Sequence, residues 1–357
     1  MKKIAIVTLT KNPNYGNVLQ NIALQYILKA YGCETETIIN YAGSSLFYKG
    51  VHLKKKIKTL LNYKRLFLGE VRRVRFLKCC KKHIKYSAAY YDGKKICGDI
   101  SSYDIFIAGS DQIWNTNFGL ATSYELLEFA PVGKRYSYAA SFGLSNINSA
   151  SSIHKEKISQ ALDKFESISV REDDGKVIVD SLSKNNAYVH LDPTMLIKRE
   201  EWDALVKPPR HCPDKPYILL YMLGNISEHR MEQIKILAQK YNAVIINILD
   251  NRFKTLDPLE FVWMVKNSEF IVTDSFHATV FSIIYRKRFA VMDRDDSFEN
   301  QNSRFVTLFR MAGIEGNICA ENMDIAECEI EWDIVDKNLC KRRNEAIKYL
   351  ETILKKE

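Results

Sequence analysis

A histidine in the first turn of an expected helix is the residue in this sequence best placed for acid–base chemistry. An apolar run ends at Thr273, and Asp274, Ser275 and His277 follow it. Apolar residues then recur at helical spacing, and a second apolar run occupies 289–292. This order predicts strand, helix and strand, with Asp274 or Ser275 capping the helix. The amides and dipole of a helix N-terminus favour an anion; a packed histidine behind an ordinary cap is the alternative.

The start of the chain also has the pattern of a strand followed by a helix. We expect a buried strand over 3–10 and a helix over 17–31, joined by a turn rich in Asn, Pro and Gly. Gly16 allows backbone amides to approach a ligand closely, and Asn17 can cap the helix; equally, both could serve the turn alone. The turn carries no glycine-rich nucleotide-phosphate signature, which disfavours NAD or ATP as its ligand.

Polar residues also follow the strand expected at 103–108. Ser110, Asp111 and Gln112 come soon after it, and small and polar residues at the end of a buried strand favour a ligand loop. Asp111 and Gln112 could orient a sugar hydroxyl. An Asx turn explains Ser110 and Asp111 equally well.

Two arginines are candidate ligands for an anion. Arg171 ends a further expected strand and could present its planar guanidinium to a phosphate or a carboxylate. A simple ion pair with the adjacent Glu172 is the alternative. Arg304 stands at the start of a helix expected near 303–312.

Three motifs, taken together and in this order, resemble the polysaccharide pyruvyl transferase family. They are NYGNVLQ at 14–20, AGSDQIWN at 108–115 and TDSFHATVFS at 273–282, and the resemblance extends from residue 4 to about residue 313. It implies a GT-B-like arrangement, in which two Rossmann-like domains with parallel sheets face a central cleft. It also implies an activity: a pyruvyl group moves from phosphoenolpyruvate to a sugar hydroxyl pair of a surface or extracellular polysaccharide. A ketal forms and phosphate is released, with phosphoenolpyruvate as donor substrate and no further cofactor or metal.

Such chemistry needs an acid for the enol methylene, cations or amides for the donor anion, and a base for the hydroxyls. We expect His277 to be the acid. The candidate donor or anion ligands are Arg171, Ser275, Arg304, Gly16 and Asn17, and the candidate acceptor ligands are Gln20, Ser110, Asp111 and Gln112.

The chain departs from one branch of the family at a single position. That branch has an arginine two residues before the histidine, where this chain has Ser275. Either Arg304 or Arg286 substitutes for it, or the donor is different. Two other functions therefore remain open: a GT-B-like transferase with another donor, such as a nucleotide sugar, and a non-catalytic glycan-binding or assembly protein.

Strand and helix patterns alternate in two halves of the 357 residues, which predicts an α/β protein with two parallel sheets. A proline-rich stretch at 207–216 lies near the boundary. We expect an N-terminal Rossmann-like domain over 1–198 with a basic helical insertion at about 49–85. A C-terminal Rossmann-like domain over 199–357 would carry TDSFHA, and His277 and the Gly16–Asn17 turn would line one cleft.

Composition argues against a membrane protein, a disulfide framework and a zinc site. The chain is 46% apolar and 27% charged and has no apolar run of the roughly 18 residues that a membrane helix needs. The first apolar run is interrupted by Lys11 and lacks a cleavage site, so we interpret it as a strand of a cytoplasmic protein. The eight cysteines contain no Cys-x-x-Cys pair, which argues against a disulfide framework and a zinc site.

The net charge of +9 is concentrated in one segment. Residues 49–85 hold fourteen Lys or Arg against one acid, Glu70. This segment could contact an anionic membrane at the inner face, close to a saccharide acceptor that is itself lipid-linked; we expect no nucleic-acid partner. A solvated pair of basic helices is the alternative.

Overall fold

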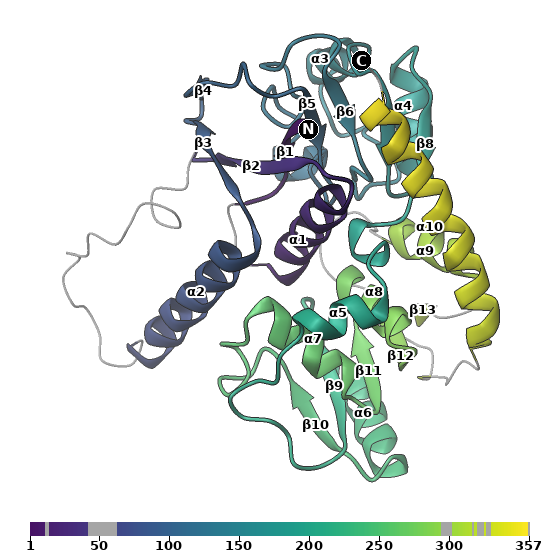
Figure 1. Ribbon diagram of the computed structural model, residues 1–357. Coiled ribbons are helices and arrows are strands. Elements are labelled where there is room, and N and C mark those ends of the chain that lie inside the picture. The colour runs from purple at the N-terminus through teal and green to yellow at the C-terminus, as the bar shows by residue number, and fades with distance from the viewer. Residues whose placement is uncertain are drawn as a thin grey trace. The chain divides into compact units, whose positions relative to one another are not determined.

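The computed structural model describes residues 1–10, 14–41, 63–293, 302–315, 318–319, 325 and 330–355, whose elements are labelled in Figure 1. The chain divides into two compact units. Unit 1 comprises Met1–Leu61, Cys80–Leu196 and Arg342–Glu357, and unit 2 comprises Asn62–Cys79 and Ile197–Lys341. Each unit is described here by itself.

Unit 1 is built on a sheet with the strand order β4-β3-β2-β1-β5-β6. Its strands are β1 (Lys3–Val7), β2 (Glu34–Asn40), β3 (Tyr86–Tyr91), β4 (Ile96–Cys97), β5 (Ile105–Ala108) and β6 (Arg135–Ser137). All neighbours run parallel except β3 and β4. A second parallel pair, β7 (Ile168–Val170) and β8 (Ala187–Val189), lies beside β6, because isolated bridges join Tyr136 to Ser167 and Ala140 to Val170.

The first helix of unit 1 begins earlier than the sequence predicts. Helix α1 (Tyr15–Ala30) is capped by Asn14, whose side-chain oxygen accepts hydrogen bonds from the amides of Gly16 at 2.8 Å and Asn17 at 3.4 Å. The prediction of a helix that starts at Asn17 and is capped by it is therefore wrong. The physical reason is that Asn14 has the extended backbone of an N-cap and reaches the first free amides of the helix.

Unit 1 contains further helical elements. They are η1 (Thr116–Phe118), α3 (Ser152–Leu162), α4 (Asp173–Leu182), η2 (Pro193–Met195) and the end of α10 (Trp332–Lys355). Of these, α3 and α4 contribute residues to its core. The core includes Trp114, which is fully buried and packs against Phe142 and Phe165 with ring centroids 5.5 and 5.9 Å apart. Trp114 belongs to the AGSDQIWN motif, so the core anchors the loop that carries Asp111 and Gln112.

Unit 2 contains a second sheet, with the order β10-β9-β11-β12-β13 and parallel neighbours throughout. Its strands are β9 (Tyr217–Tyr221), β10 (Val244–Asn247), β11 (Phe270–Thr273), β12 (Arg288–Met292) and β13 (Ile318–Cys319). Its helices are α2 (Tyr63–His83) for the most part, α5 (Arg199–Leu205), α6 (Glu228–Lys240), α7 (Pro258–Lys266), α8 (Phe276–Ile284), α9 (Ser303–Ala312) and the start of α10. The strand–helix–strand order predicted around His277 is confirmed as β11, α8 and β12.

Besides a boundary that lies two residues earlier, after Leu196, the two units differ from the contiguous domains 1–198 and 199–357 at two places. Most of α2 belongs to unit 2, where Arg75 forms an ion pair with Glu260 of α7. The end of α10 belongs to unit 1, where the Tyr349 hydroxyl donates to the carbonyl of Ser137 at 2.9 Å. The unit to which each of these two segments belongs is set by its tertiary contacts and not by its position in the sequence.

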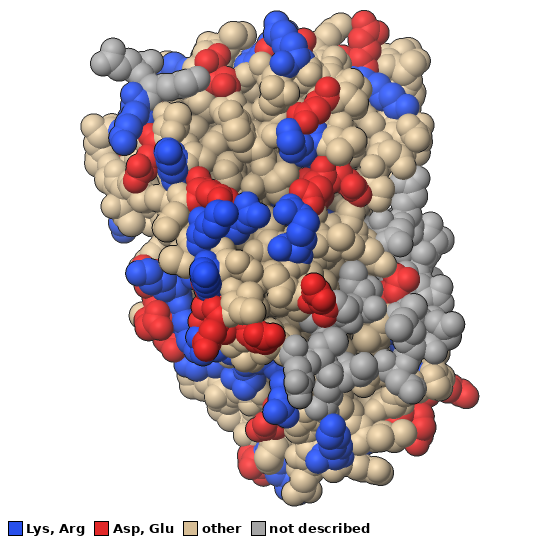
Figure 2. Space-filling view, turned by 90° about the vertical axis from the view of Figure 1, so that its right-hand side faces the viewer, with Lys and Arg blue, Asp and Glu red and all other residues tan. Residues whose placement is uncertain are grey.

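The predicted fold class, α/β with parallel sheets, is confirmed. Within the described ranges, no helix is long and apolar enough to cross a membrane. On the face drawn in Figure 2, basic and acidic side chains are intermixed over the described residues.

Candidate functional site

Each sheet has a point at which the order of its strands reverses. In unit 1, β1 lies between β2 and β5, and in unit 2, β9 lies between β10 and β11. The helices that follow the two central strands on either side of such a point leave a crevice at the carboxyl ends, where open α/β sheets bind ligands. The predicted site residues follow these strands in both units.

Buried polar side chains lie at the carboxyl end of β1. Gln20 is fully buried, and its amide nitrogen donates to the hydroxyl of Thr8 at 2.8 Å. The Thr8 hydroxyl in turn donates to the carbonyl of Ser110 at 2.9 Å, which connects these side chains to the loop after β5. Within the described chain, the Gln20 side-chain oxygen and the hydroxyl of Thr10 have no hydrogen-bond partner. Buried polar atoms are usually satisfied, so these two are available to a ligand.

The loop after β5 holds Asp111 and Gln112 in fixed positions. Asp111 has a φ of 78°, in the left-handed region, and its carbonyl accepts a hydrogen bond from the amide of Ser141 at 3.0 Å. The side-chain oxygen of Gln112 accepts from Asn115 at 2.7 Å. Gly143 packs directly against Gln112, because a Cβ at Gly143 would lie 2.6 Å from the Gln112 Cδ. Gly143 also has a φ of 63°, so a glycine is required here on both counts.

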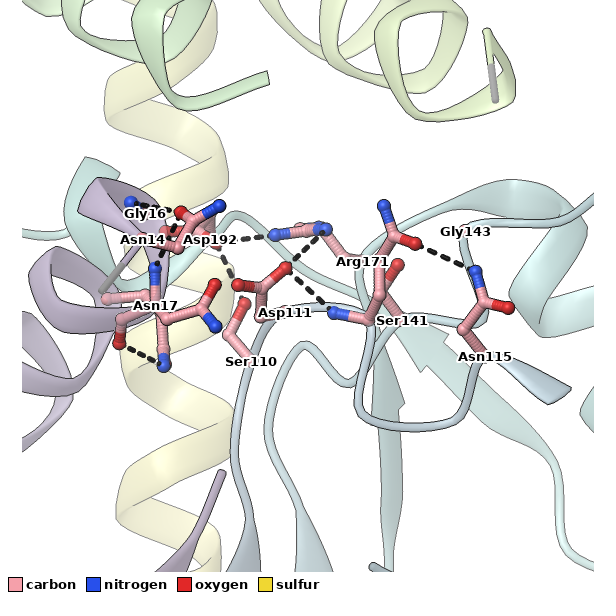
Figure 3. Close-up of polar contacts among 12 residues, drawn as sticks. Asn14, Gly16, Asn17, Ser110, Asp111, Asn115, Ser141, Gly143, Arg171 and Asp192 are labelled. Atoms are coloured by element: carbon pink, nitrogen blue, oxygen red, sulfur yellow. Dashed lines mark hydrogen bonds and ion pairs between the residues drawn. The ribbon is translucent and has the colours of Figure 1, made fainter. Parts of the chain in front are cut away.

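Arg171 lies at the centre of a buried network of charges (Figure 3). Its side chain is 1% exposed and faces carboxylate oxygens of Asp192 at 3.0 Å, Asp111 at 3.7 Å and Glu172 at 3.9 Å. The strongest of these contacts is a charge-assisted hydrogen bond to Asp192, 21 residues away in the sequence. This geometry favours the ion-pair alternative for Arg171, with Asp192 rather than Glu172 as the main partner.

Asp192 is engaged by the fold through both carboxylate oxygens, and Glu172 is engaged through Oε1. Asp192 also accepts hydrogen bonds from the Ser110 hydroxyl at 2.8 Å and from the Thr194 amide and hydroxyl at 3.0 and 2.6 Å. Glu172 accepts from the Ser141 hydroxyl and from the amides that follow it at 2.8 to 3.0 Å. Sequence reasoning missed the structural roles of Asp192, Gly143 and Ser141. The LDPT sequence at 191–194 offered the one local signal, an aspartate before proline at the end of a strand.

In unit 2, the N-terminus of helix α8 lacks the side-chain cap that the sequence predicts. Asp274 does not cap α8; its carboxylate accepts hydrogen bonds from the amides of Leu223, at 2.8 and 2.9 Å, and Gly224, at 2.7 Å. Ser275 occupies the N-cap position, but its side chain makes no cap hydrogen bond. The prediction of a side-chain cap is therefore wrong, because Asp274 joins the loop after β9 to the loop after β11. The first turn of α8 begins without a side-chain cap.

His277 lies in that first turn and is 7% exposed. Its ring meets the ring of Phe276 edge to face, with centroids 5.4 Å apart. The Arg304 guanidinium, from the first turn of α9, lies 5.8 Å from the centroids of both Phe276 and Phe305. Phe276 thus places a cation beside the N-terminus of α8.

Arg286, the other candidate for the missing arginine, lies at the opposite end of α8. It follows the C-cap Tyr285 and forms an exposed ion pair with Asp336. Arg304 is therefore the better substitute of the two. The structure brings Gly16, Asn17, Gln20, Ser110, Asp111 and Arg171 to the carboxyl edge of the unit 1 sheet, and Ser275, His277 and Arg304 to that of unit 2. The expectation that both sets line one cleft stays a prediction.

Comparisons with known proteins give a family and distant structural likenesses. A family model described as polysaccharide pyruvyl transferase matches residues 14–296. No curated protein matches the chain. The structure of MnaA from S. aureus with UDP is 12% identical, with a TM-score of 0.45 over 97% of this chain and 88% of that chain. The UDP-GlcNAc 2-epimerase from Neisseria meningitidis bound to UDP-GlcNAc is also 12% identical, with a TM-score of 0.45 over 99% and 93% of the two chains.

The match of the family model covers most of the sequence and includes all three motifs, at 14–20, 108–115 and 273–282. The chain therefore belongs to the polysaccharide pyruvyl transferase family and is a transferase that modifies polysaccharides.

Proposed function

We propose that this protein transfers a pyruvyl group from phosphoenolpyruvate to two hydroxyls of one sugar in a surface or extracellular polysaccharide. The products are a cyclic ketal and inorganic phosphate. The observation that carries the proposal is the position of His277, in the first turn of α8 at the carboxyl end of β11 and within the span of the family match.

His277 is suited to the first chemical task, protonation of the enol methylene. A side chain in the first turn of a helix at the end of a parallel strand can reach a ligand held by the helix amides. Proton donation to C3 converts the methylene to a methyl group and makes C2 electrophilic. His277 stands at such a helix terminus, and the adjacent Phe276 packs against both the His277 ring and the Arg304 guanidinium.

The donor anion would be held by three features of unit 2. The N-terminal amides of α8 begin without a side-chain cap, the dipoles of α8 and α9 add positive potential, and Arg304 supplies a guanidinium. Ser275 is half-buried at the N-cap and can donate a hydrogen bond in place of the arginine found in one branch of the family. This arrangement suits a ligand that carries both phosphate and carboxylate groups.

The acceptor would be held by unit 1. The buried oxygens of Gln20 and Thr10 and the side chains of Asp111 and Gln112 offer hydrogen-bond partners to sugar hydroxyls at the β1–β5 crevice. Amide and hydroxyl oxygens and a carboxylate accept hydrogen bonds from sugar hydroxyls, whereas the carboxylate repels an anion. The saccharide is therefore assigned to unit 1 and the anionic donor to unit 2.

Phosphate release from phosphoenolpyruvate, measured with a panel of diol-bearing glycans, tests the proposal. We expect release that depends on one acceptor class and a new ketal methyl signal in the proton NMR spectrum of the glycan. A parallel series with nucleotide sugars tests the other transferase reading. Turnover of a nucleotide sugar and none of phosphoenolpyruvate would overturn the proposed donor.

A cytoplasmic location and contact with an anionic membrane through residues 49–85 belong to the same proposal. Residues 49–62 lie outside the described residues. On the described part of α2, Lys78, Lys81 and Lys82 are exposed, and Val74 is 43% exposed beside them. Such a surface would bring the enzyme to a lipid-linked acceptor.

A further inference from the structure

We propose that Asp111 is the general base that takes the proton from the attacking sugar hydroxyl, a role that rests on the proposed pyruvyl transfer. Three carboxylates surround Arg171, and exposure separates them. The side chains of Asp192 and Glu172 are 0% exposed, whereas that of Asp111 is 11% exposed. Asp111 is thus the member of this group that a substrate can reach.

Hydrogen bonding also separates Asp192 from Asp111, and Glu172 is separated from Asp111 by its complete burial. Asp192 uses both oxygens on Ser110, Thr194 and Arg171. The contacts of Asp111 with Arg171 and with the amide of Gln112, at 2.8 Å, both involve Oδ1. Among the described residues these contacts leave Oδ2 of Asp111 for a substrate hydroxyl.

The fold holds Asp111 in a conformation that local preference would not select. Its φ of 78° is uncommon for a residue other than glycine, although aspartate and asparagine tolerate this region best. A bridge between Asp111 and Ala140 and the hydrogen bond from Ser141 keep the backbone there. Such conformations cluster at functional sites, where the surrounding structure determines them.

A second, independent observation concerns the hydrogen-bonding capacity of two side chains at the end of β1 and in α1. The oxygens of Gln20 and Thr10 are buried and, over the described residues, have no hydrogen-bond partner. Gln20 is connected to the Asp111 loop, because it donates to Thr8 and Thr8 donates to Ser110. Ligand hydroxyls can donate to these oxygens while another hydroxyl of the same sugar donates to Asp111.

The reaction balances with this assignment. As the first hydroxyl oxygen bonds to C2, Asp111 takes its proton and C3 receives one, so a tetrahedral phosphoryl ketal forms. The second hydroxyl oxygen then bonds to C2, the bond between C2 and the phosphate oxygen breaks, and the second hydroxyl proton leaves with inorganic phosphate. One hydroxyl proton thus replaces the proton delivered to C3, and no oxidant or reductant is involved.

Asp111→Asn tests the base directly. Asparagine keeps the size of the side chain and tolerates the positive φ, but it cannot accept the proton. We expect kcat for phosphate release to fall by roughly 10²- to 10⁴-fold, with little change in the KM for phosphoenolpyruvate. Asp104→Asn is the matched control, since Asp104 is exposed and precedes the same strand at its other end, where it accepts from the Lys3 amide at 2.7 Å. This control should leave kcat unchanged.

Asp111→Gly with added formate separates a base from a structural residue. Glycine adopts the positive φ without strain and leaves room for a small carboxylate, so formate should restore turnover in proportion to its concentration. Near-normal kcat in Asp111→Asn would overturn the base role while pyruvyl transfer stands. Failure of formate together with lost saccharide affinity would make Asp111 a binding residue only. A wild-type protein inert with phosphoenolpyruvate and every acceptor would overturn both proposals.

Discussion

His190 makes the stability of unit 1 depend on pH. It is 8% exposed, its ring lies 4.7 Å from that of Tyr349, and its Nδ1 is 2.9 Å from the Ser169 hydroxyl. Burial lowers the pKa of His190 from 6.5 to about 4. The negative charge of Glu345 raises this pKa by less than burial lowers it, and the positive charge of Arg342 lowers it further by a smaller amount. The folded state therefore keeps His190 neutral at a pH at which the unfolded chain protonates it.

The sign and size of the effect follow from these two values. Above pH 6.5 the histidine is neutral in both states and does not affect stability. Between pH 6.5 and 4 the unfolded chain binds a proton that the folded protein does not, so stability is lost as the pH falls. At ~1.4 kcal/mol for each pH unit, we expect this single group to cost about 2 kcal/mol between pH 7 and pH 5.

Urea unfolding at pH 7 and pH 5 measures this loss in the wild type and in His190→Asn. Asparagine removes the titration and keeps a hydrogen-bonding atom close to the position of Nδ1, beside Ser169. The variant starts less stable because it loses the ring contact with Tyr349, but its own loss between the two pH values should be smaller by about 2 kcal/mol. Equal losses in the two proteins would refute the assignment of the pH dependence to His190.

Three further predictions concern the proposed activity and its setting. His277→Gln should lower phosphate release by roughly 10²- to 10⁴-fold with little effect on donor affinity; near-normal turnover in the folded variant would remove His277 from catalysis. Arg171→Lys should lower the free energy of unfolding by about 1–3 kcal/mol, because one ammonium cannot replace the planar contacts to Asp192 and Asp111. Weaker phosphoenolpyruvate binding at unchanged stability would instead return Arg171 to the donor site. Protein should float with anionic but not neutral vesicles at low salt and be released by salt; equal flotation would favour solvated helices at 49–85.

Local patterns in the sequence were sufficient to predict the strand–helix–strand unit around His277. The apolar run before Thr273 and the helical spacing after Phe276 are properties of adjacent residues, and each selects one secondary structure by itself. The same holds for the buried strands β1 and β5 and for the polar turns that follow them. The family resemblance could likewise be found in the sequence, because its motifs are contiguous.

The partners of the predicted site residues could not be found in this way. Arg171 and Glu172 are neighbours in the chain, yet the guanidinium bonds most closely to Asp192, and Glu172 turns to the loop at 141–143. These contacts exist because β5 pairs with β6, β7 pairs with β8, and isolated bridges join the two pairs. Sequence periodicity does not specify which strands become neighbours.

The sequence by itself therefore determined which residues can do chemistry and on which elements they stand. The tertiary structure decided which hydrogen-bond partners most of these residues have, and therefore which of them can still contact a ligand. Asp274 was a candidate cap but holds the amides of Leu223 and Gly224, and Asn14 caps α1 in place of Asn17. The physical reason is competition for unsatisfied amides: Asp274 takes amides that the pairing of β9 with β11 brings close, whereas Asn14 takes the amides two and three residues later in the chain.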